Sequence, residues 1–349
     1  MKPVIAVLAG DGIGPEVVGA AVSVLKACLP VTVREGLVGG AAIDATGDPL
    51  PRETLDVCLQ ANAVLLGPLG APEALLQRLR RALSLHATLR PARYLGLPTP
   101  LRDGLARHAD LLVVRDVPGA PEAGEPWGAT STEAVNIWRL SADQVRRVAH
   151  VAFQQARRRR RKLTSVDKAG LLETSRLWRA VVSEVAREYT DVELEHRPLE
   201  GVGFEILCAP HHFDVIVTEN LFGEILADQA AAVAGSIGLL ASACLGSGPP
   251  GLYQPVHGPA GDLAGRGVAN PTGAILAVAL LIEHALGQPE LARAIEASVA
   301  AALREVRTPD IGGSAGTEEL TAAVLRHLSW SRWSQSQEED EGSVAEWGV

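Results

Sequence analysis

Residues 257–271, HGPAGDLAGRGVANP, are the stretch that decides the fold of this chain. Four glycines interrupt it and no apolar period runs through it, so we expect a loop rather than a helix or a strand. Pro271 is suited to begin the apolar helix that follows, because proline fits the first turn of a helix. Such a loop exposes backbone N–H groups, and the helix N-terminus adds a partial positive charge. The stretch therefore predicts a site for an anionic ligand.

The composition of the chain is that of a globular protein. It has 349 residues, of which 47% are hydrophobic and 21% charged, with a formal net charge of −9. This length suffices for two ordinary domains. The negative charge argues against general binding of nucleic acid. The basic run at 157–162 is expected to be the solvated C-terminus of a helix, with a nucleic-acid or membrane patch as the alternative.

Four cysteines lie far apart in apolar surroundings, at Cys28, Cys58, Cys208 and Cys244. This spacing suits no metal site and predicts buried free thiols in a reducing compartment. The N-terminus reaches glycine too soon for a signal peptide, and no apolar run is long enough to span a bilayer. We therefore expect a cytoplasmic protein without a membrane partner.

Short apolar runs alternate with helical patterns along the chain. The runs that predict buried strands lie at 4–9, 64–66, 111–114, 163–166 and 213–217. Strands that alternate with helices imply an α/β fold. Residues 239–252 are rich in glycine and serine and are expected to be a connection. Residues 329–349 lack periodicity and are expected to be a disordered tail.

The turn after the first strand, GDGIGPE at residues 10–16, invites comparison with dinucleotide-binding loops. Its spacing is G-x-G-x-G rather than G-x-G-x-x-G, which disfavours a Rossmann interpretation. It resembles instead the N-terminal signature of the isopropylmalate and isocitrate dehydrogenase family. Residues 257–271 resemble the adenine-binding loop of the same family.

The resemblance extends over residues 3–328. The clearest matches lie at residues 40–44, 89–92, 114–115, 165–169, 213–218, 235–246 and 312–318. The resemblance implies the α/β two-domain fold of isopropylmalate dehydrogenase, which is not a Rossmann fold, with a cleft between the domains. It also implies that residues 1–94 and 236–328 form the cofactor-binding domain. Residues 95–235 would form the domain for substrate binding and dimerisation.

The activity that this resemblance implies is NAD-dependent oxidative decarboxylation of a 2-hydroxy-3-carboxy acid. The first candidate substrate is 3-isopropylmalate, an intermediate of leucine biosynthesis. Arg90 and Arg115 match substrate-binding arginines of the family, and a guanidinium fork holds a carboxylate at two points. Lys168 matches the catalytic lysine, whose pKa falls in a partly desolvated site beside a metal cation. In the family this lysine reaches into the neighbouring subunit, which implies a homodimer with shared active sites.

The expected metal is Mg²⁺ or Mn²⁺, held by Glu200, Glu224 and Asp228. Glu224 and Asp228 are four residues apart, which places them on one face of a helix. Carboxylate oxygens are the ligands that such hard cations prefer. Glu200 would come from the other subunit, and Asp228 would also serve catalysis. Glu200 and Glu224 stand where the family has aspartates, so a solvated helix face is the alternative for this pair.

The resemblance also assigns the cofactor contacts. The residues that would bind NAD are His257, Gly258, Ala260, Asp262 and Asn270. Asp262 stands where relatives that use NAD carry an acidic residue. A carboxylate there accepts hydrogen bonds from the ribose hydroxyls and repels a 2′-phosphate, so NAD is favoured over NADP.

Several positions depart from the family pattern. The proton-donating tyrosine of the family aligns with Glu122, which would donate a proton only if burial raised its pKa. Tyr94 and Tyr253 are alternative donors. The family's third arginine, sought shortly after Arg90, finds no counterpart there. The loop at 70–75 is short, and it leads into a helix whose Leu76 would contact the variable group of the substrate.

These departures leave two further hypotheses open. One is a paralogue that acts on another substituted malate or on homoisocitrate. The other is a non-catalytic homologue that keeps the dimer. The retained lysine, arginines and carboxylates favour an enzyme.

Overall fold

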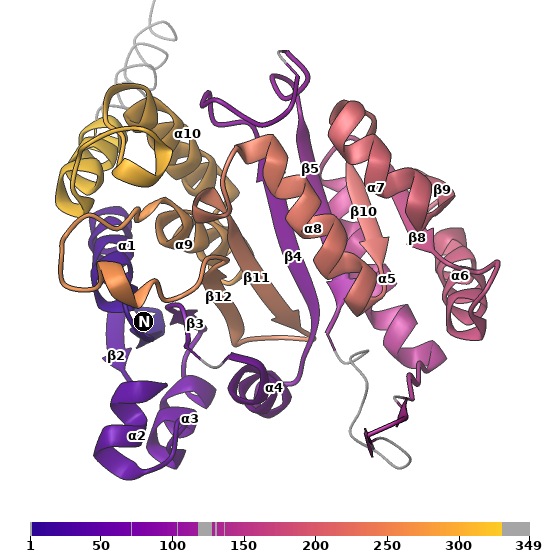
Figure 1. Ribbon diagram of the computed structural model, residues 1–349, viewed down its shortest axis with the longest axis horizontal. Coiled ribbons are helices and arrows are strands. Elements are labelled where there is room, and N and C mark those ends of the chain that lie inside the picture. The colour runs from indigo at the N-terminus through magenta and orange to yellow at the C-terminus, as the bar shows by residue number, and fades with distance from the viewer. Residues whose placement is uncertain are drawn as a thin grey trace, which may run out of the picture. The chain divides into compact units, whose positions relative to one another are not determined.

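The structure is a computed structural model that describes residues 2–329, apart from 71, 103, 118–127, 130 and 136. Candidate Glu122 and residues 330–349 of the expected tail lie outside the described residues. Helices and strands alternate along the described chain, so the α/β expectation is confirmed (Figure 1). Within this part, no helix combines the length and the apolar character needed to cross a membrane.

The chain divides into two compact units. The first comprises Met1–Leu79, Leu95–Leu97 and Pro249–Val349, and the second comprises Arg80–Tyr94 and Pro98–Gly248. The sequence predicted domain boundaries at 94/95 and 235/236, between a cofactor-binding domain and a domain for substrate binding and dimerisation. These functional domains stay a prediction.

The first unit contains a parallel sheet covered by helices. Its strands, in spatial order, are β2 (Thr32–Glu35), β1 (Val4–Leu8), β3 (Ala63–Leu66) and β12 (Gly251–Pro255). Its helices are α1 (Gly14–Cys28), α2 (Gly40–Thr46), α3 (Arg52–Leu59), α9 (Thr272–His284), α10 (Pro289–Glu305) and most of α4 (Pro72–Ala82). Residues 317–329 are also helical. Most of α9 is buried, as its almost continuous apolar sequence requires, because it packs against α1, α10 and β12.

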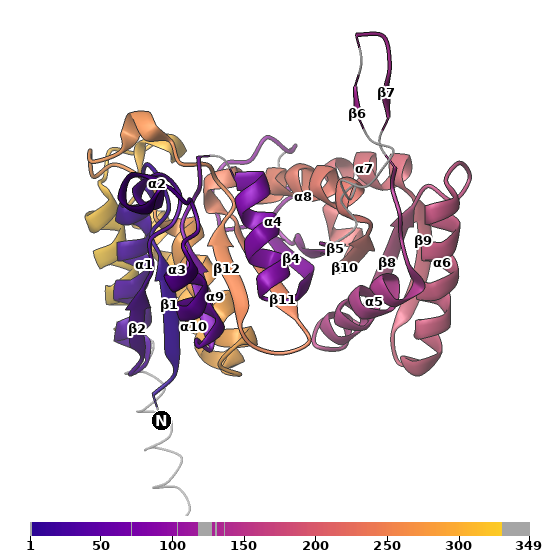
Figure 2. The same ribbon diagram turned by 90° about the horizontal axis from the view of Figure 1, so that it is seen from below.

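The second unit contains a mixed sheet. Its strands, in spatial order, are β11 (Ala241–Gly246), β4 (Leu85–Arg93), β5 (Asp110–Asp116), β10 (Val215–Thr218), β8 (Lys162–Asp167) and β9 (Glu193–Pro198). The pairs β11–β4 and β4–β5 are antiparallel, and the later pairs are parallel. The helices of this unit are α5 (Ala142–Arg157), α6 (Glu173–Val185), α7 (Leu199–Cys208) and α8 (Asn220–Ala234). Short strands β6 (Gly128–Ala129) and β7 (Ala134–Val135) pair as a hairpin that projects from this unit (Figure 2).

Short 3₁₀ turns complete the described elements. They lie at Ala186–Glu188, Pro210–His212, Ile237–Leu239, Gly261–Leu263 and Pro309–Ile311.

One aliphatic core of the second unit fixes helix α8 on the sheet. Leu226 and Val233 of α8 are fully buried with Val113 of β5 and Ile216 of β10. Leu226 and Val233 thus face the sheet, while the carboxylates of Glu224 and Asp228 are partly exposed. This arrangement places the candidate metal ligands beside the end of β5.

Two expectations from the sequence were wrong. Residues 239–252 are not a mere connection, because they contain β11 and the start of β12. The small residues of β11 are buried against β4, and a strand built of small residues has the composition of a loop. Cys28, Cys58 and Cys244 are buried thiols outside any disulfide as expected, but Cys208 is exposed at the end of α7.

Candidate active site

Two arginines project from one face of the mixed sheet in the second unit. Arg115 lies opposite Thr88 in the β4–β5 ladder, and Arg90 is two residues further along β4. Residues diagonal across a strand pair share a face, so both guanidinium groups lie on the same side. Arg115 is only 2% exposed. Burial lowers the pKa of Arg115 to about 10, and the positive charge of Arg90 acts in the same direction.

Arg80, in the last turn of α4, is a third cation of this cluster. Its charge acts on both Arg90 and Arg115. The family's third arginine has no counterpart in the sequence shortly after Arg90, and the structure adds to the cluster an arginine that precedes Arg90 in the chain. The sequence did hold a sign of this position of Arg80. Leu76 and Leu79 have the spacing of a buried helical stripe, and Arg80 lies at the edge of that stripe.

Each of these three arginines has a buried Nε atom that lacks a hydrogen-bond partner in the described part of the chain. A buried N–H group without a partner is costly, especially on a charged group. The atoms of an anionic ligand would satisfy these donors. The arginine cluster, defined as Arg80, Arg90 and Arg115, is therefore chemically suited to carboxylate groups.

Helix α8 brings two carboxylates to this cluster. Oε1 of Glu224 lies 2.9 Å from Nη1 of Arg115, and Oδ1 of Asp228 lies 3.1 Å from Nη1 of Arg90. Gly223 permits this approach, because a Cβ atom there would lie 2.5 Å from Cβ of Arg115. The structure thus brings together four of the residues that the sequence nominated.

Lys168 and Glu200 form a second charged pair. Lys168 follows β8, Glu200 lies in the first turn of α7, and Nζ of Lys168 contacts Oε1 of Glu200. Within residues 2–329, outside the gaps, no three His, Cys, Asp or Glu side chains gather closely enough to hold a metal ion. The donor type of Glu224 and Asp228 fits Mg²⁺ or Mn²⁺, but a single chain does not assemble the expected set of three.

The loop at 257–271 is anchored in the first unit. Its Gly265 N–H donates to Oε1 of Glu16 at 2.5 Å, and Nδ2 of Asn270 donates to Oδ2 of Asp310 at 3.0 Å. The Asn270 side chain also accepts from the N–H of Thr272, the first residue of α9, at 3.0 Å. Ala260 has a φ of 38°, a conformation that costs a residue with a Cβ about 1–2 kcal/mol. This loop is therefore held in a defined shape rather than left to the solvent.

His257, in the loop at 257–271, has one ring nitrogen that forms no hydrogen bond within the described residues. Its Nδ1 lies 3.0 Å from the carbonyl oxygen of Gly258. Its Nε2 is buried and has no hydrogen-bond partner among the described residues. Burial lowers the pKa of His257, so the ring is neutral at pH 7. Gly258 and Asp262 of the same loop are exposed, so the loop offers a neutral imidazole, a backbone group and a carboxylate as hydrogen-bonding groups.

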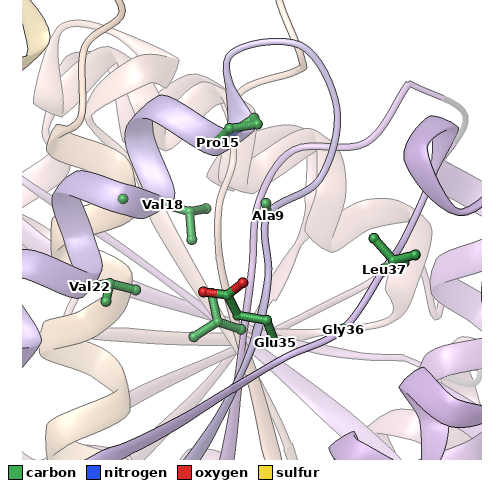
Figure 3. Close-up of a pocket in the computed structure, with 9 residues that line it drawn as sticks. Ala9, Pro15, Val18, Val22, Glu35, Gly36 and Leu37 are labelled. Carbon is green, nitrogen blue, oxygen red and sulfur yellow. The ribbon is translucent and has the colours of Figure 1, made fainter.

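The glycine turn after β1 is not free to bind phosphate. Its N–H groups are used inside the protein: Asp11 donates to Pro68 at 2.7 Å, and Ile13 donates to Pro259 at 2.8 Å. Beside the turn lies a pocket of about 330 Å³ with apolar walls that include Val18 and Val22 (Figure 3). Glu35 is the one charged residue of its lining, which disfavours a pyrophosphate. The structure therefore agrees with the rejection of a Rossmann interpretation.

Two other features predicted from the sequence are Leu76 and the basic run at 157–162. Leu76 is buried in α4 at 8% exposure, so its contact with a substrate stays a prediction. The basic run is largely neutralised: Arg157 pairs with Asp191, and both Arg159 and Arg160 pair with the buried Asp214. These pairs favour the interpretation of the run as a structural helix end.

A family model described as isocitrate/isopropylmalate dehydrogenase matches residues 4–324. The chain belongs to this family. Its curated relatives include the 3-isopropylmalate dehydrogenase of Novosphingobium aromaticivorans, which is 46% identical over 93% of this chain and 99% of the relative. The 3-isopropylmalate dehydrogenase of Deinococcus radiodurans is 45% identical over 94% and 99%.

Solved structures of the family agree with the fold. The isocitrate dehydrogenase from Methylococcus capsulatus matches with a TM-score of 0.85 and 36% identity, over 94% of this chain and 99% of that chain. A β-decarboxylating dehydrogenase from Thermococcus kodakarensis in its apo form matches with a TM-score of 0.81 and 34% identity, over 94% and 96%. The fold class expected from the sequence is thereby confirmed.

Proposed function

We propose that this chain catalyses NAD-dependent oxidative decarboxylation of a 3-substituted malate, with 3-isopropylmalate as the first candidate. The observation that carries the proposal is the arginine cluster beside the two carboxylates of α8, because its three buried Nε atoms lack a partner among the residues that the structure describes. The names of the curated relatives support the same substrate. In this role the chain would serve leucine biosynthesis.

The arginine cluster would bind the two carboxylates of the substrate. Arg90 and Arg115 present their guanidinium groups on one face of the sheet, and Arg80 adds charge at the end of α4. Three fixed cations would orient a dicarboxylate and offset the cost of removing it from water. Leu76 would contact the variable group from the same helix as Arg80.

Lys168 would act as the base. Its Nζ accepts the proton of the C2 hydroxyl as the C2 hydride leaves, which gives a 3-carboxy ketone. The bond from C3 to its carboxylate would then break, CO₂ would leave with the bonding electrons staying on the ketone fragment, and the resulting enolate would take a proton at C3. Glu200, in contact with Lys168, would hold the amine in place. The donor of the last proton is proposed to be Glu122 or one of Tyr94 and Tyr253.

The residues present fit both groups that the family uses. Glu224 and Asp228 would hold Mg²⁺ or Mn²⁺ from one chain, and Glu200 of a second copy would complete the oxygen ligands. His257, Gly258, Ala260, Asp262 and Asn270 would hold NAD. When bound, NAD supplies the hydride acceptor, and the divalent cation supplies charge that stabilises a developing negative oxygen.

We propose a second copy of this chain as the partner. Helices α7 and α8 lie together, since Gly203 of α7 approaches the side chain of Gln229 on α8. Both helices expose large apolar side chains: Phe204 is 71% exposed, Leu221 51% and Ile225 50%. Exposed apolar groups of this size are typical of a protein interface. A homodimer formed there would bring the Lys168–Glu200 pair of one subunit towards the other.

The test is NADH formation by the purified protein, followed by absorbance. The substrates are 3-isopropylmalate, other substituted malates, homoisocitrate and isocitrate, each with and without Mn²⁺ and with NAD or NADP. Turnover with 3-isopropylmalate that needs Mn²⁺ and NAD supports the proposal. Turnover only with another substrate identifies a paralogue. NAD binding without turnover on any substrate identifies the non-catalytic homologue and overturns the proposal.

A further inference from the structure

Glu219, the residue before α8, is an unusual acid in the second unit. It occupies the N-cap position of the helix but forms no side-chain cap. It is fully buried, at 0% exposure, and its carboxyl group turns towards α6. There Oε1 accepts a hydrogen bond of 2.5 Å from Oγ of Ser175, which is also fully buried. Glu219 therefore joins the first turns of two helices.

The surroundings of this carboxyl group disfavour a negative charge. Its Oε2 is buried and has no hydrogen-bond partner in the described part of the chain. Burial raises the pKa of Glu219 and the negative charge of Asp167 adds to this effect, so that the pKa is raised although the hydrogen bonds from Ser175 and Thr174 lower it. The cation that pairs with Asp167 is Arg179, which donates to both oxygens of that carboxylate at 2.9 and 3.0 Å. An ionised Glu219 would face Asp167 without a cation of its own.

Glu219 lies between two parts of the candidate active site. Asp167 directly precedes Lys168, and its Oδ1 accepts from the N–H of Ala169 at 2.9 Å. On the other side, Glu219 directly precedes Asn220, whose side chain accepts from Nη1 of Arg115. The carboxyl group thus lies where the turn that carries Lys168 meets the start of the helix that carries Glu224.

We propose that Glu219 is a positioning residue which, as an uncharged carboxyl group, holds the turn of Lys168 against the N-terminus of α8. The roles of Lys168 and Arg115 rest on the proposed function. The charged group that acts on Glu219 is Asp167 of β8. Arg179 of α6 pairs with Asp167, and the charge of Asp167 also acts on His196 of β9. On the other side, Arg115 of β5 is linked to this site through Asn220. No carboxylate other than Asp167 is needed to explain why a proton on Glu219 is favoured.

The first test concerns the proton and needs no activity. The folded protein holds the proton of Glu219 more tightly than the unfolded chain does, because the pKa is raised on folding. The stability that this proton contributes is therefore complete below the ordinary glutamate pKa of 4.5, and it is lost as the pH rises through the raised pKa of the folded protein. We expect the Tm of the wild type to fall relative to Glu219→Gln as the pH rises above that value. The infrared band of a protonated carboxyl group should persist above pH 4.5 in the wild type and disappear in Glu219→Gln. Glu193→Gln, at an exposed glutamate of β9, is the matched control and should retain both properties.

The second test concerns positioning. Glu219→Ala should raise amide hydrogen exchange at residues 168–172 and 219–223, with no change at 257–271. It should lower kcat about 10- to 100-fold with the KM for NAD unchanged. Glu219→Gln keeps an uncharged group of the same shape and should restore both. The proposal is overturned if the infrared band and the pH dependence survive in Glu219→Gln, or if the alanine and glutamine variants exchange alike. If the purified protein shows no turnover, the proposed function fails, but the infrared and hydrogen-exchange measurements still test the role of Glu219.

Discussion

The guanidinium group of Arg90 donates a hydrogen bond to Oδ1 of Asp228 over 3.1 Å, so a candidate substrate clamp and a candidate metal ligand share one contact. Arg115 and Glu224 repeat this arrangement at 2.9 Å. Each cation occupies an oxygen that a metal ion would take, and each carboxylate occupies an N–H group that a substrate would take. A metal ion that bound the two carboxylates would free the two arginines for the substrate, and a substrate that bound the arginines would free the carboxylates for the metal ion.

This relationship predicts positive coupling between the metal and the dicarboxylate. We expect the substrate to lower the Kd of Mn²⁺ by about 5- to 150-fold, the usual range for two linked sites. Titration calorimetry with and without 3-isopropylmalate measures this factor. Mn²⁺ must lower the Kd of the substrate by the same factor, which is an internal control. Equal Mn²⁺ affinities in the two titrations would rule out the coupling.

Arg80 is predicted to bind the substrate. Arg80→Gln removes one cation of the arginine cluster and a charge-assisted hydrogen bond worth about 1.5–3 kcal/mol. We expect the KM for the malate substrate to rise roughly 10- to 100-fold while the KM for NAD stays the same. Arg81→Gln, at an exposed position on the same helix, is the matched control and should behave as the wild type. Equal KM values in the two variants would remove Arg80 from the site.

The sequence located some of these residues and missed others for physical reasons. Glu224 and Asp228 were nominated by the family resemblance, and helical spacing then predicted that they lie on one face. Arg80 was missed because a third arginine was sought only after Arg90, in the order of the family motif. The proximity of Arg80 to the other two arginines depends instead on how α4 packs. Glu219 gave no signal, since a glutamate before a helix is ordinarily a solvated residue. Its burial depends on Ser175, which lies far away in the chain. Long-range packing of this kind has no local pattern in a sequence.

Asp11 is predicted to fix the loop that leads into α4. Its Oδ1 accepts from the N–H of Gly40 and its Oδ2 from the N–H of Gly70, both at 2.7 Å. Asp11→Asn leaves one of these N–H groups facing an amide NH₂ instead of an oxygen. We expect a loss of roughly 2–4 kcal/mol in urea unfolding and a higher KM for the malate substrate. The exposed Asp44 of α2 supplies the control, and an Asp44→Asn variant as destabilised as Asp11→Asn would contradict the prediction.

His257 is predicted to bind NAD through its neutral ring. Burial lowers its pKa from the ordinary value of 6.5, so the unfolded chain takes up a proton before the folded protein does. Stability is therefore constant above pH 6.5 and falls as the pH drops from 6.5 towards the lowered pKa. The affinity for NAD should stay constant from pH 8 to about 6.5, since the ring is neutral throughout that range.

The variant His257→Ala separates the two effects. It should weaken NAD binding about tenfold, because it removes the buried Nε2 that lacks a partner within the described protein. It should also remove this part of the acid destabilisation below pH 6.5. Fluorescence titration with NAD and thermal unfolding across the pH range measure the two quantities. His108→Ala, at an exposed histidine of the second unit, should change neither. If His257→Ala binds NAD as the wild type does, the loop at 257–271 recognises the nucleotide through its backbone and Asp262 alone.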